Sequence, residues 1–413
     1  MIISEISGNV TAISPEDRFF VSGSRQEIRE VPLETEEADR DRNQKEEDSP
    51  MTRYVNDSDL LQFVQSVFSS FGISRENALI CADNLVLADL RGVSSHGVAR
   101  LRRYVDGMTN GTILPHSKPV VVREAPSTAT IDGQAGLGQI AGHFSTRTAI
   151  EKAQKTGVGI VAVRNSNHYG IAGYYTQMML DAGLLGISMT NTAPLVVPTF
   201  GRKMIIGTNP ISLTAPTKRN RPFFLDMATS VVPRGKLEIY DRTDRDMPAG
   251  WAVDSRGLTT TNATEVLKNM VARLGGGILP LGGEGELYGG YKGYGIALLV
   301  DILCGVLSGG AYADMVDVKG PAGEGQPARV AHFFMALNIE NFVELDVFQE
   351  KMDDLIDRLK KSEKAEGQER IYIHGEKEYE LYERHKSSGV LLEEPVYHSL
   401  KAIALERGVP FEL

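Results

Sequence analysis

The chain contains little of what a disulfide-rich, membrane-spanning or nucleic-acid-binding protein needs. Its two cysteines, Cys81 and Cys304, are too few for a disulfide framework or a four-cysteine zinc site. Such sparse use is typical of a reducing compartment, here the cytoplasm. No stretch approaches the ~20 consecutive apolar residues of a membrane-spanning helix. The formal net charge of −10 is the opposite of the basic stripe that binds nucleic acid. We therefore expect neither a nucleic-acid partner nor a membrane partner.

What the chain does contain is the composition of an ordinary globular protein. Its 413 residues are 42% hydrophobic and 24% charged, which is enough for a sizeable core in two or three domains. The charge is uneven, because residues 1–50 hold 13 acidic and 6 basic side chains. Between Glu34 and Asp48 the only apolar residue is Ala38, so burial cannot offset the entropy of ordering. We predict that residues 1–50 form an acidic, disordered leader.

The spacing of apolar residues after the leader predicts an α/β or α+β protein with a central sheet. Helices are predicted over 58–71, 75–88, 94–109, 140–156, 170–181, 348–361 and 396–406. Strands are predicted over 119–123, 128–132, 158–164, 184–190, 212–215, 222–226 and 332–339, and a glycine-aromatic loop over 289–295. We expect a helical part at 51–125, a sheet-containing part at 126–330 and a C-terminal part at 331–413 that packs back on the first.

The densest group of chemically useful side chains is Ser95-His96-Gly97-Val98-Ala99-Arg100, followed by Tyr104. On one continuous helix, Arg100 and Tyr104 would project within about 40° and 80° of His96, so all three would share a side. There the arginine can grip a substrate carboxylate while the histidine exchanges a proton with a neighbouring oxygen. Spacing alone favours a plainer interpretation, in which these are solvated side chains of a surface helix.

A second polar group, Asn165-Ser166-Asn167-His168-Tyr169-Gly170, lies where a predicted buried strand ends and a helix begins. In α/β proteins this junction often faces the ligand, and a helix N-terminus offers free N–H groups to phosphate. A polar loop with a helix cap is an equally good interpretation.

Other catalytic motifs are missing. The glycines of Gly136–Gly142 have the spacing GxGxxxG, and no acidic residue ends the next strand, which favours a close-packed turn over a Rossmann site. The histidines His96, His116, His143 and His168 are scattered without HxH or HExxH spacing, and neither CxxC nor GxSxG occurs. We expect no metal and no serine hydrolase.

One motif and eight further segments, taken in order, are similar to a known family. Residues 91–100 read RGVSSHGVAR. The supporting segments are SNHYG at 166–170, GTNP at 207–210, DMATS at 226–230, GWAVD at 250–254, LPLGG at 279–283, GGYKGYG at 289–295, HFFMAL at 332–337 and HGEKE at 374–378. From about Thr52 to the C-terminus the chain resembles the malate/L-lactate dehydrogenase family. That family includes sulfolactate, ureidoglycolate and 2,3-diketogulonate-type reductases and is distinct from the Rossmann-fold lactate and malate dehydrogenases.

The resemblance implies a non-Rossmann nicotinamide-binding fold with a large, mostly antiparallel sheet and a helical region from both chain ends. It also implies a homodimer with the active site between domains. By the same resemblance, His96 donates the proton to the substrate oxygen, Ser95 is its hydrogen-bonded relay partner and Arg100 holds the substrate carboxylate. Tyr104, Thr208 and Arg234 are further substrate contacts. The cofactor, NAD or NADP, would be bound by His168, Tyr169, Gly170, Ile171, Ala172, Asp226, Met227, Ala228, Gly375, Glu376 and Lys377.

The sequence therefore predicts an NAD(P)-dependent dehydrogenase that interconverts a 2-hydroxy acid and a 2-oxo acid, malate or lactate first. An imidazole with an ordinary pKa near ~6.5 would serve as proton donor in one direction and base in the other. The alternative among enzymes is reduction of another carbonyl or of a cyclic imine acid. The alternative outside enzymes is a non-catalytic binding protein, against which Ser95, His96, Arg100 and His168 together argue.

Overall fold

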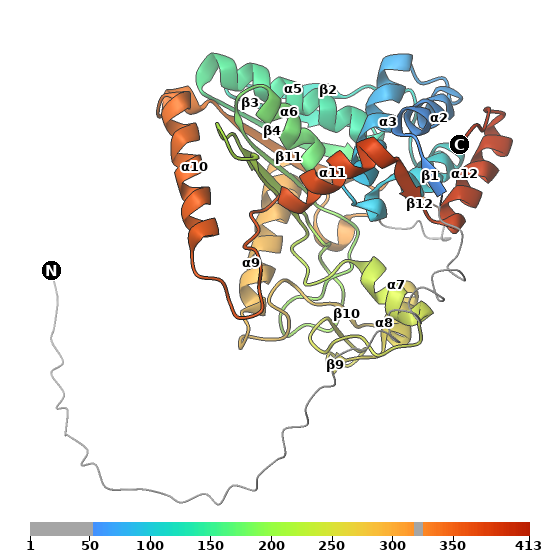
Figure 1. Cartoon of the computed structure of the whole chain (residues 1–413). Helices are drawn as coiled ribbons and strands as arrows, with labels where there is room; N and C mark the ends of the chain where they lie inside the picture. The colour runs from blue at the N-terminus through green and yellow to red at the C-terminus, as the bar shows by residue number, and fades with distance from the viewer. Residues whose placement is uncertain (1–52, 318–324) are drawn as a thin grey trace, which may run out of the picture. The chain divides into compact units, whose positions relative to one another are not determined.

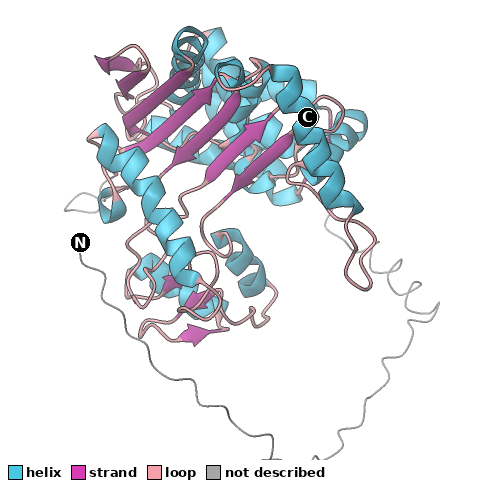
Figure 2. Ribbon diagram, turned by 90° about the vertical axis from the view of Figure 1, so that its left-hand side faces the viewer, coloured by secondary structure: helices cyan, strands magenta, loops and turns pink. Residues whose placement is uncertain are grey.

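A seven-stranded sheet lies at the centre of the described residues (Figure 2). The structure, a computed structural model, describes residues 53–317 and 325–413, and the predicted leader at 1–50 lies outside these ranges. In spatial order the strands are β2 (Val120–Glu124), β3 (Thr128–Asp132), β4 (Val158–Ser166), β11 (Val330–Leu337), β5 (Leu185–Thr190), β6 (Ile211–Ala215) and β7 (Phe223–Met227). Neighbouring strands are antiparallel except β3 and β4. This mixed, mostly antiparallel sheet confirms the expected fold class.

Helices pack against both faces of this sheet. They are α5 (Gly138–Thr156) and α6 (Gly173–Asp181) on one face, and α9 (Gly290–Asp301) with its π-helical continuation η3 (Ile302–Val306) on the other. Side chains alternate between faces along a strand. Phe334 of β11 therefore packs in the core under α5 and α6, whereas its neighbour Phe333 packs with Val300 and Cys304. Covered on both faces, the sheet is a firm support for the loops at its strand ends.

Both ends of the chain build a helical unit next to the sheet (Figure 1). Its elements are β1 (Arg53–Val55), α2 (Asp57–Ser69), α3 (Arg75–Leu90), α4 (Leu101–Thr109), α11 (Glu376–Ser388), β12 (Val390–Leu392) and α12 (Glu394–Arg407). Strand β1 pairs antiparallel with β12. Leu60 and Val64 of α2 share one apolar core with Leu400 and Ile403 of α12. This confirms the helical region from both chain ends.

A further apolar core lies between β5 and α9 in the sequence. Its elements are α7 (Arg234–Arg242), β8 (Ala252–Val253), β9 (Thr259–Thr260), α8 (Ala263–Ala272) and β10 (Gly277–Ile278), grouped at the lower right of Figure 1. The three strands form one small sheet in the order β10-β8-β9. We did not predict these elements, because the strands are two residues long and α7 buries only Leu237.

The structure corrects three expectations about local structure. Residues 94–109 are not one helix, because the extended backbone of Gly97 separates a first 3₁₀ turn from a second one, which leads directly into α4. The glycines of 289–295 do not form a loop, since α9 begins at Gly290. A Cβ at Gly293 would lie 2.0 Å from the Leu281 carbonyl oxygen, so this glycine allows close helix packing. The helix predicted from Gly170 begins at Gly173.

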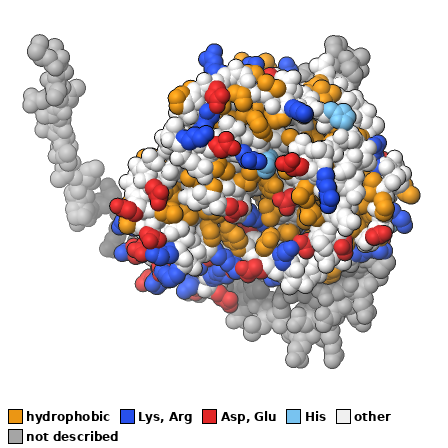
Figure 3. Space-filling model, turned by 90° about the horizontal axis from the view of Figure 1, so that it is seen from above, with side chains coloured by type: hydrophobic (Ala, Val, Ile, Leu, Met, Phe, Trp, Pro, Cys, Tyr) orange, Lys and Arg blue, Asp and Glu red, His pale blue; other side chains and the backbone are white. Residues whose placement is uncertain are grey.

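The remaining long helix, α10 (Leu345–Lys361), is tied to the β6–β7 turn. Its buried Asp353 accepts hydrogen bonds from the backbone N–H groups of Arg219 (2.9 Å) and Asn220 (2.9 Å). Within residues 53–317 and 325–413, no helix combines the length and the apolar character needed to cross a membrane. The face seen in Figure 3 carries acidic and basic side chains interspersed among apolar ones.

Candidate active site

The segment that carries His96 is held by a buried carboxylate. The 3₁₀ turns η1 (Ser94–His96) and η2 (Val98–Arg100) follow α3, and Asp89 of α3 accepts a hydrogen bond from the backbone N–H of Val98 (2.7 Å). A Cβ at Gly97 would lie 1.9 Å from the Asp89 Oδ1 atom, so only glycine lets the carboxylate reach this N–H. Burial raises the pKa of Asp89 to about 7. The glycine of the Ser-His-Gly motif thus has a defined structural role.

Two short turns in place of one helix still bring the predicted groups together. Ser95 Oγ lies 3.0 Å from His96 Nδ1, and Arg100 Nε donates to the Ser95 carbonyl oxygen at 2.6 Å. The helical-wheel reason that we gave for this proximity is therefore wrong, although the grouping itself is present. Since Nε of Arg100 is engaged, its two Nη atoms are left for a ligand. The Nε2 atom of His96 makes no hydrogen bond within the described residues.

The second histidine, His168, lies against the first. The rings of His96 and His168 are stacked, with centroids 5.5 Å apart and planes at 25°. The Tyr104 hydroxyl lies 2.6 Å from His168 Nδ1, and the N–H of Gly170 lies 3.3 Å from the same atom. Because a backbone N–H can only donate, Nδ1 is the acceptor, and the proton of the neutral ring is assigned to Nε2. His168 thus presents an N–H donor beside His96.

A close contact between two elements places His168 where strand β4 meets the start of α5. A Cβ at Gly138 would lie 2.2 Å from the Asn167 carbonyl oxygen and 2.4 Å from that of His168. The glycines of 136–142 therefore serve close packing, as the interpretation that we favoured over a Rossmann motif predicts.

The electrostatics of the cluster differ from our expectation. Burial, followed by the charges of Arg100 and Arg103, lowers the pKa of His96 to about 4. Burial also places the pKa of His168 well below its usual value, and Arg103 and His96 add to this shift. The ordinary pKa near ~6.5 that we assumed for His96 is wrong for this environment. Both imidazoles are neutral at neutral pH in the free protein.

Three site groups lie deep in the protein and still keep exposed surface. His96 and His168 are half-buried and Asp226 is exposed, although burial is the main cause of the pKa shift of each. Each of these three side chains, in η1, just after β4 and in β7, therefore combines dense protein surroundings with surface that a ligand can reach.

Asp226 is the best placed of the predicted cofactor residues. Its Oδ2 atom accepts a hydrogen bond from the N–H of Gly173 at the start of α6 (2.7 Å), and its Oδ1 atom has no partner within the described residues. Burial raises its pKa to about 6, and the hydrogen bond from Gly173 and the charge of Arg91 act in the opposite direction. Met227 and Ala228, which follow it, are half-buried.

The other predicted cofactor and substrate residues vary in position. Gly170 is buried, and Tyr169, Ile171 and Ala172, at 1%, 5% and 2% exposure, belong to the core under α5 and α6. Any contact of these three with a cofactor would come through the backbone. Thr208 accepts backbone and side-chain hydrogen bonds from Thr229 on its carbonyl oxygen, which joins the GTNP and DMATS segments.

The predicted loop at 375–377 is the start of α11, with Gly375 at the N-cap position, and it packs along β7. The N–H of Phe224 donates to the His374 carbonyl oxygen (3.1 Å), and a Cβ at Gly375 would lie 2.5 Å from the Phe224 Cβ. The Glu376 carboxylate accepts hydrogen bonds from Lys360 on one oxygen and from Arg370 (3.1 Å) on the other, so both of its oxygens are paired within the protein. The Lys377 ammonium lies 4.4 Å from the centre of the Tyr372 ring.

Helix α7 lies near Arg100. Arg234, its first residue, forms an i,i+4 ion pair with Glu238 at 2.9 Å. Both are close enough to Arg100 to change its pKa. Arg103, which we did not single out, is close enough to lower the pKa of His96, His168 and Arg100. Its signal in the sequence was its position three residues after Arg100, on the same face of a helix.

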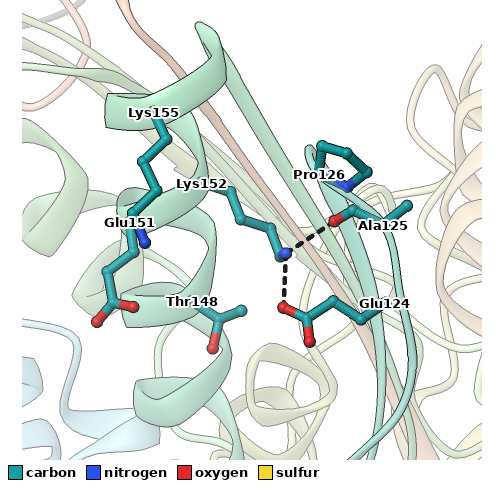
Figure 4. A pocket seen from close by; sticks show the side chains of 7 residues that line it. All are labelled: Glu124, Ala125, Pro126, Thr148, Glu151, Lys152 and Lys155. Atoms are coloured by element: carbon teal, nitrogen blue, oxygen red, sulfur yellow. Dashed lines mark hydrogen bonds and ion pairs between the residues drawn. The ribbon is translucent and has the colours of Figure 1, made fainter.

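A surface depression lies away from this cluster. It lies between the β2–β3 turn and α5, measures about 460 Å³ and is lined by Glu124, Glu151, Lys152 and Lys155 among others (Figure 4). Lys152 donates to Glu124 Oε1 (2.8 Å) and to the Ala125 carbonyl oxygen (2.9 Å). This ion pair joins the hairpin to α5, and none of the predicted site residues lines the depression. Within residues 53–317 and 325–413, no three histidine, cysteine or acidic side chains are grouped so that they could hold a metal ion.

Three comparisons relate the chain to proteins already named. A family model described as malate/L-lactate dehydrogenase matches residues 55–401. A malate dehydrogenase of Pyrococcus horikoshii is 52% identical over 350 residues, which are 85% of this chain and 94% of that protein. An L-sulfolactate dehydrogenase of Methanocaldococcus jannaschii is 39% identical over 351 residues, which are 85% of this chain and 96% of that protein. The solved structure of the Pyrococcus horikoshii malate dehydrogenase matches with a TM-score of 0.78 and 48% identity, over 87% of this chain and 97% of that one.

The fold and the comparisons agree on an oxidoreductase of a hydroxy-acid dehydrogenase family. The chain belongs to the malate/L-lactate dehydrogenase family. It is an enzyme, and membership of a dehydrogenase family implies a nicotinamide cofactor.

Proposed function

We propose that this protein is a malate dehydrogenase that interconverts malate and oxaloacetate with NAD or NADP, with lactate and pyruvate as the second substrate pair. The proposal rests on one observation: the two adjacent 3₁₀ turns bring Ser95, His96 and Arg100 together, with His168 stacked on His96. The relative named malate dehydrogenase supports the same choice at 52% identity.

The predicted cofactor residues offer hydrogen-bonding groups that suit a nicotinamide dinucleotide. The Oδ1 atom of Asp226 is free to accept a hydrogen bond from a ribose hydroxyl, and the assigned Nε2–H of His168 can donate to a carboxamide or carbonyl oxygen. His168–Ala172, Asp226–Ala228 and the Gly375–Lys377 loop would hold the cofactor. When bound, nicotinamide supplies hydride exchange with the carbon that bears the substrate oxygen.

The chain's own residues would supply the carboxylate grip and the proton transfer. The free Nη atoms of Arg100 can hold the substrate carboxylate with two parallel hydrogen bonds, because Nε is already fixed on the Ser95 carbonyl. The adjacent Nε2 atom of His96 then faces the substrate hydroxyl. If His96 Nδ1–H donates to Ser95 Oγ, the lone pair is on Nε2 and accepts the hydroxyl proton as the hydroxy acid is oxidised.

The lowered pKa of His96 favours this direction in the free enzyme. With a pKa of about 4, the ring is a neutral base at neutral pH and needs no prior loss of a proton. For reduction, His96 must first take up a proton. A substrate carboxylate between Arg100 and His96 makes this easier, because its negative charge offsets the arginine charge that lowers the pKa.

We also propose that the protein is a homodimer in the cytoplasm. Support for a dimer comes from the outer face of α9 and η3, where Ile296, Leu299, Ile302, Val306 and Leu307 are each at least 38% exposed. An apolar stripe of this kind is typical of a covered surface. Light scattering should therefore give twice the mass of one chain. Both cysteines are buried and unpaired, which suits a reducing compartment.

The test of the function is a nicotinamide absorbance assay with NADH and NADPH against oxaloacetate, pyruvate, sulfopyruvate, 2,3-diketogulonate and a cyclic imine acid. We expect oxaloacetate to give the largest kcat/KM. A larger kcat/KM for one of the last three acids would replace malate by that substrate class. If none of these acids is reduced although cofactor binding is measurable, the non-catalytic alternative would be favoured.

A further inference from the structure

Two adjacent arginines of α4 have opposite surroundings. Arg102 donates to Glu406 of α12 (3.0 Å) and lies 3.5 Å from Asp106, so its charge is compensated within the protein. Arg103 is exposed and makes neither an ion pair nor a hydrogen bond with residues 53–317 and 325–413. Successive helix residues point about 100° apart, which is why the two side chains meet different neighbours.

Arg103 lies in the first turn of α4, close in the chain to two groups of the candidate site. It precedes Tyr104, whose hydroxyl lies 2.6 Å from His168 Nδ1, and follows Arg100 by three residues on the same helical face. The charge of Arg103 helps to lower the pKa of His96, of His168 and of Arg100. A cation that acts on all three groups lies near them.

The charges around Arg100 are not balanced by the protein. Glu238, a carboxylate close enough to Arg100 to act on its pKa, is paired with Arg234. Neither Arg100 nor Arg103 makes an ion pair with residues 53–317 and 325–413, so two guanidinium groups remain. One guanidinium fork binds one carboxylate. A substrate with a single carboxylate satisfies Arg100 alone, whereas a second acidic group would also satisfy Arg103.

We infer that Arg103 binds the distal acidic group of the substrate, the carboxylate or sulfonate farther from the reacting carbon, and so makes the enzyme prefer dianionic over monoanionic 2-oxo acids. This inference rests on the proposed function and adds the residue that sets its substrate class. Arg103 is a specificity residue here, separate from Arg100, which holds the carboxylate next to the reacting carbon.

The experiment compares Arg103→Gln with the matched control Arg102→Gln, using oxaloacetate, sulfopyruvate and pyruvate as substrates. Loss of one charged hydrogen-bonded contact should lower kcat/KM for the two dianions by about 10- to 100-fold, mainly through KM. The value for pyruvate should change by less than about threefold, and Arg102→Gln should leave all three within about threefold. Arg103→Lys should recover part of the loss, because it keeps the charge without the fork.

The two acidic groups are told apart within the same experiment. A selective loss for oxaloacetate supports a distal carboxylate, and a selective loss for sulfopyruvate supports a distal sulfonate. An equal loss for pyruvate would overturn the inference, since Arg103 would then act on catalysis through its field. Unchanged kinetics on both dianions would overturn it as well.

A binding measurement separates this inference from the proposed function. Malonate is a small dianion, and its protection of the cofactor-free protein against thermal unfolding can be titrated in all three proteins. Protection that is kept in Arg102→Gln and lost in Arg103→Gln supports the inference even if wild-type protein turns over no 2-oxo acid, in which case only the proposed function fails. Equal protection of the two variants contradicts it.

Discussion

His96 and His332 show two ways in which this fold treats a histidine with a lowered pKa. His332, in the central strand β11, uses both ring nitrogens, with Thr190 Oγ1 at 2.8 Å from Nδ1 and Ser166 Oγ at 2.8 Å from Nε2. Its ring is stacked on Tyr169 at 4.4 Å, and burial lowers its pKa to about 3. His96 uses one nitrogen, keeps exposed surface and has two arginines nearby.

The two histidines differ in whether one ring nitrogen is left without a hydrogen-bond partner among the described residues. A low pKa by itself does not distinguish a catalytic from a structural histidine, because burial produces it in both places. The two kinds are distinguished by a ring nitrogen that has no hydrogen-bond partner and can be reached from solvent. His96 has such a nitrogen and His332 has none, so we expect the two residues to respond differently to the same substitution.

The largest expected effect is that of His96→Gln. Removal of the proton-transfer group should lower kcat by about 10²- to 10⁴-fold, because no other residue of the turn can exchange the proton. The melting temperature should stay close to that of wild type. His332→Gln should show the reverse pattern, with a loss of about 1–3 kcal/mol in the free energy of unfolding and little loss of kcat per folded molecule.

Both quantities can be measured on the same samples, by steady-state kinetics and by thermal unfolding followed by circular dichroism. If His332→Gln lost more kcat per folded molecule than His96→Gln, the assignment of roles would be reversed.

A smaller effect is expected for Arg100→Lys. Lysine can reach neither the Ser95 carbonyl nor a carboxylate with a planar fork, so KM for oxaloacetate should rise about tenfold or more, while kcat changes less. Substrate titrations at fixed cofactor concentration separate the two constants. A fall in kcat at unchanged KM would instead mean that Arg100 orients His96 and does not bind the substrate.

The smallest expected effect is that of pH on oxidation of the hydroxy acid. Because the pKa of His96 is about 4, the base is already deprotonated above that value. We expect kcat/KM for malate oxidation to vary by less than about twofold between about pH 5 and pH 8 and to fall below about pH 4. For reduction the sign is opposite, since kcat/KM should fall as pH rises and the protonated ring becomes scarce. An inflection near pH 6.5 in the oxidation profile would show that neither burial nor the charges of Arg100 and Arg103 lower the pKa of His96 in solution.

Most of the fold was predictable from apolar spacing, since the seven strands of the main sheet and the helices α2, α3, α4 and α12 lie close to the predicted ranges, whereas α11 was not predicted. The small sheet and α7 were not, because a two-residue strand leaves no period to detect and α7 has one buried residue. The 3₁₀ turns at His96 were also hidden. These turns depend on the close contact of Gly97 with Asp89. The sequence alone does not reveal which glycine lies against a buried carboxylate.

The candidate site was predictable in its residue types but not in its electrostatics. The motif residues Ser95, His96 and Arg100 do meet, and His168 joins them from the end of β4. The pKa of His96 depends on burial and on the distances to Arg100 and Arg103, which only the folded chain defines. Likewise, only the folded structure shows that Arg102 is paired with acidic side chains whereas Arg103 has no such partner among the described residues.

The place of β11 in the main sheet has a consequence for how the protein folds. Residues 330–337 lie between β4 and β5, so these two strands, only 18 residues apart in the sequence, are joined by one that follows much later. The central pairings therefore span long loops, and long-range β pairing of this kind is slow. On the ribosome, β4 and β5 emerge well before their common partner and would present unpaired edges in the interval. We expect truncations that end before Val330 to aggregate rather than to form a smaller native sheet.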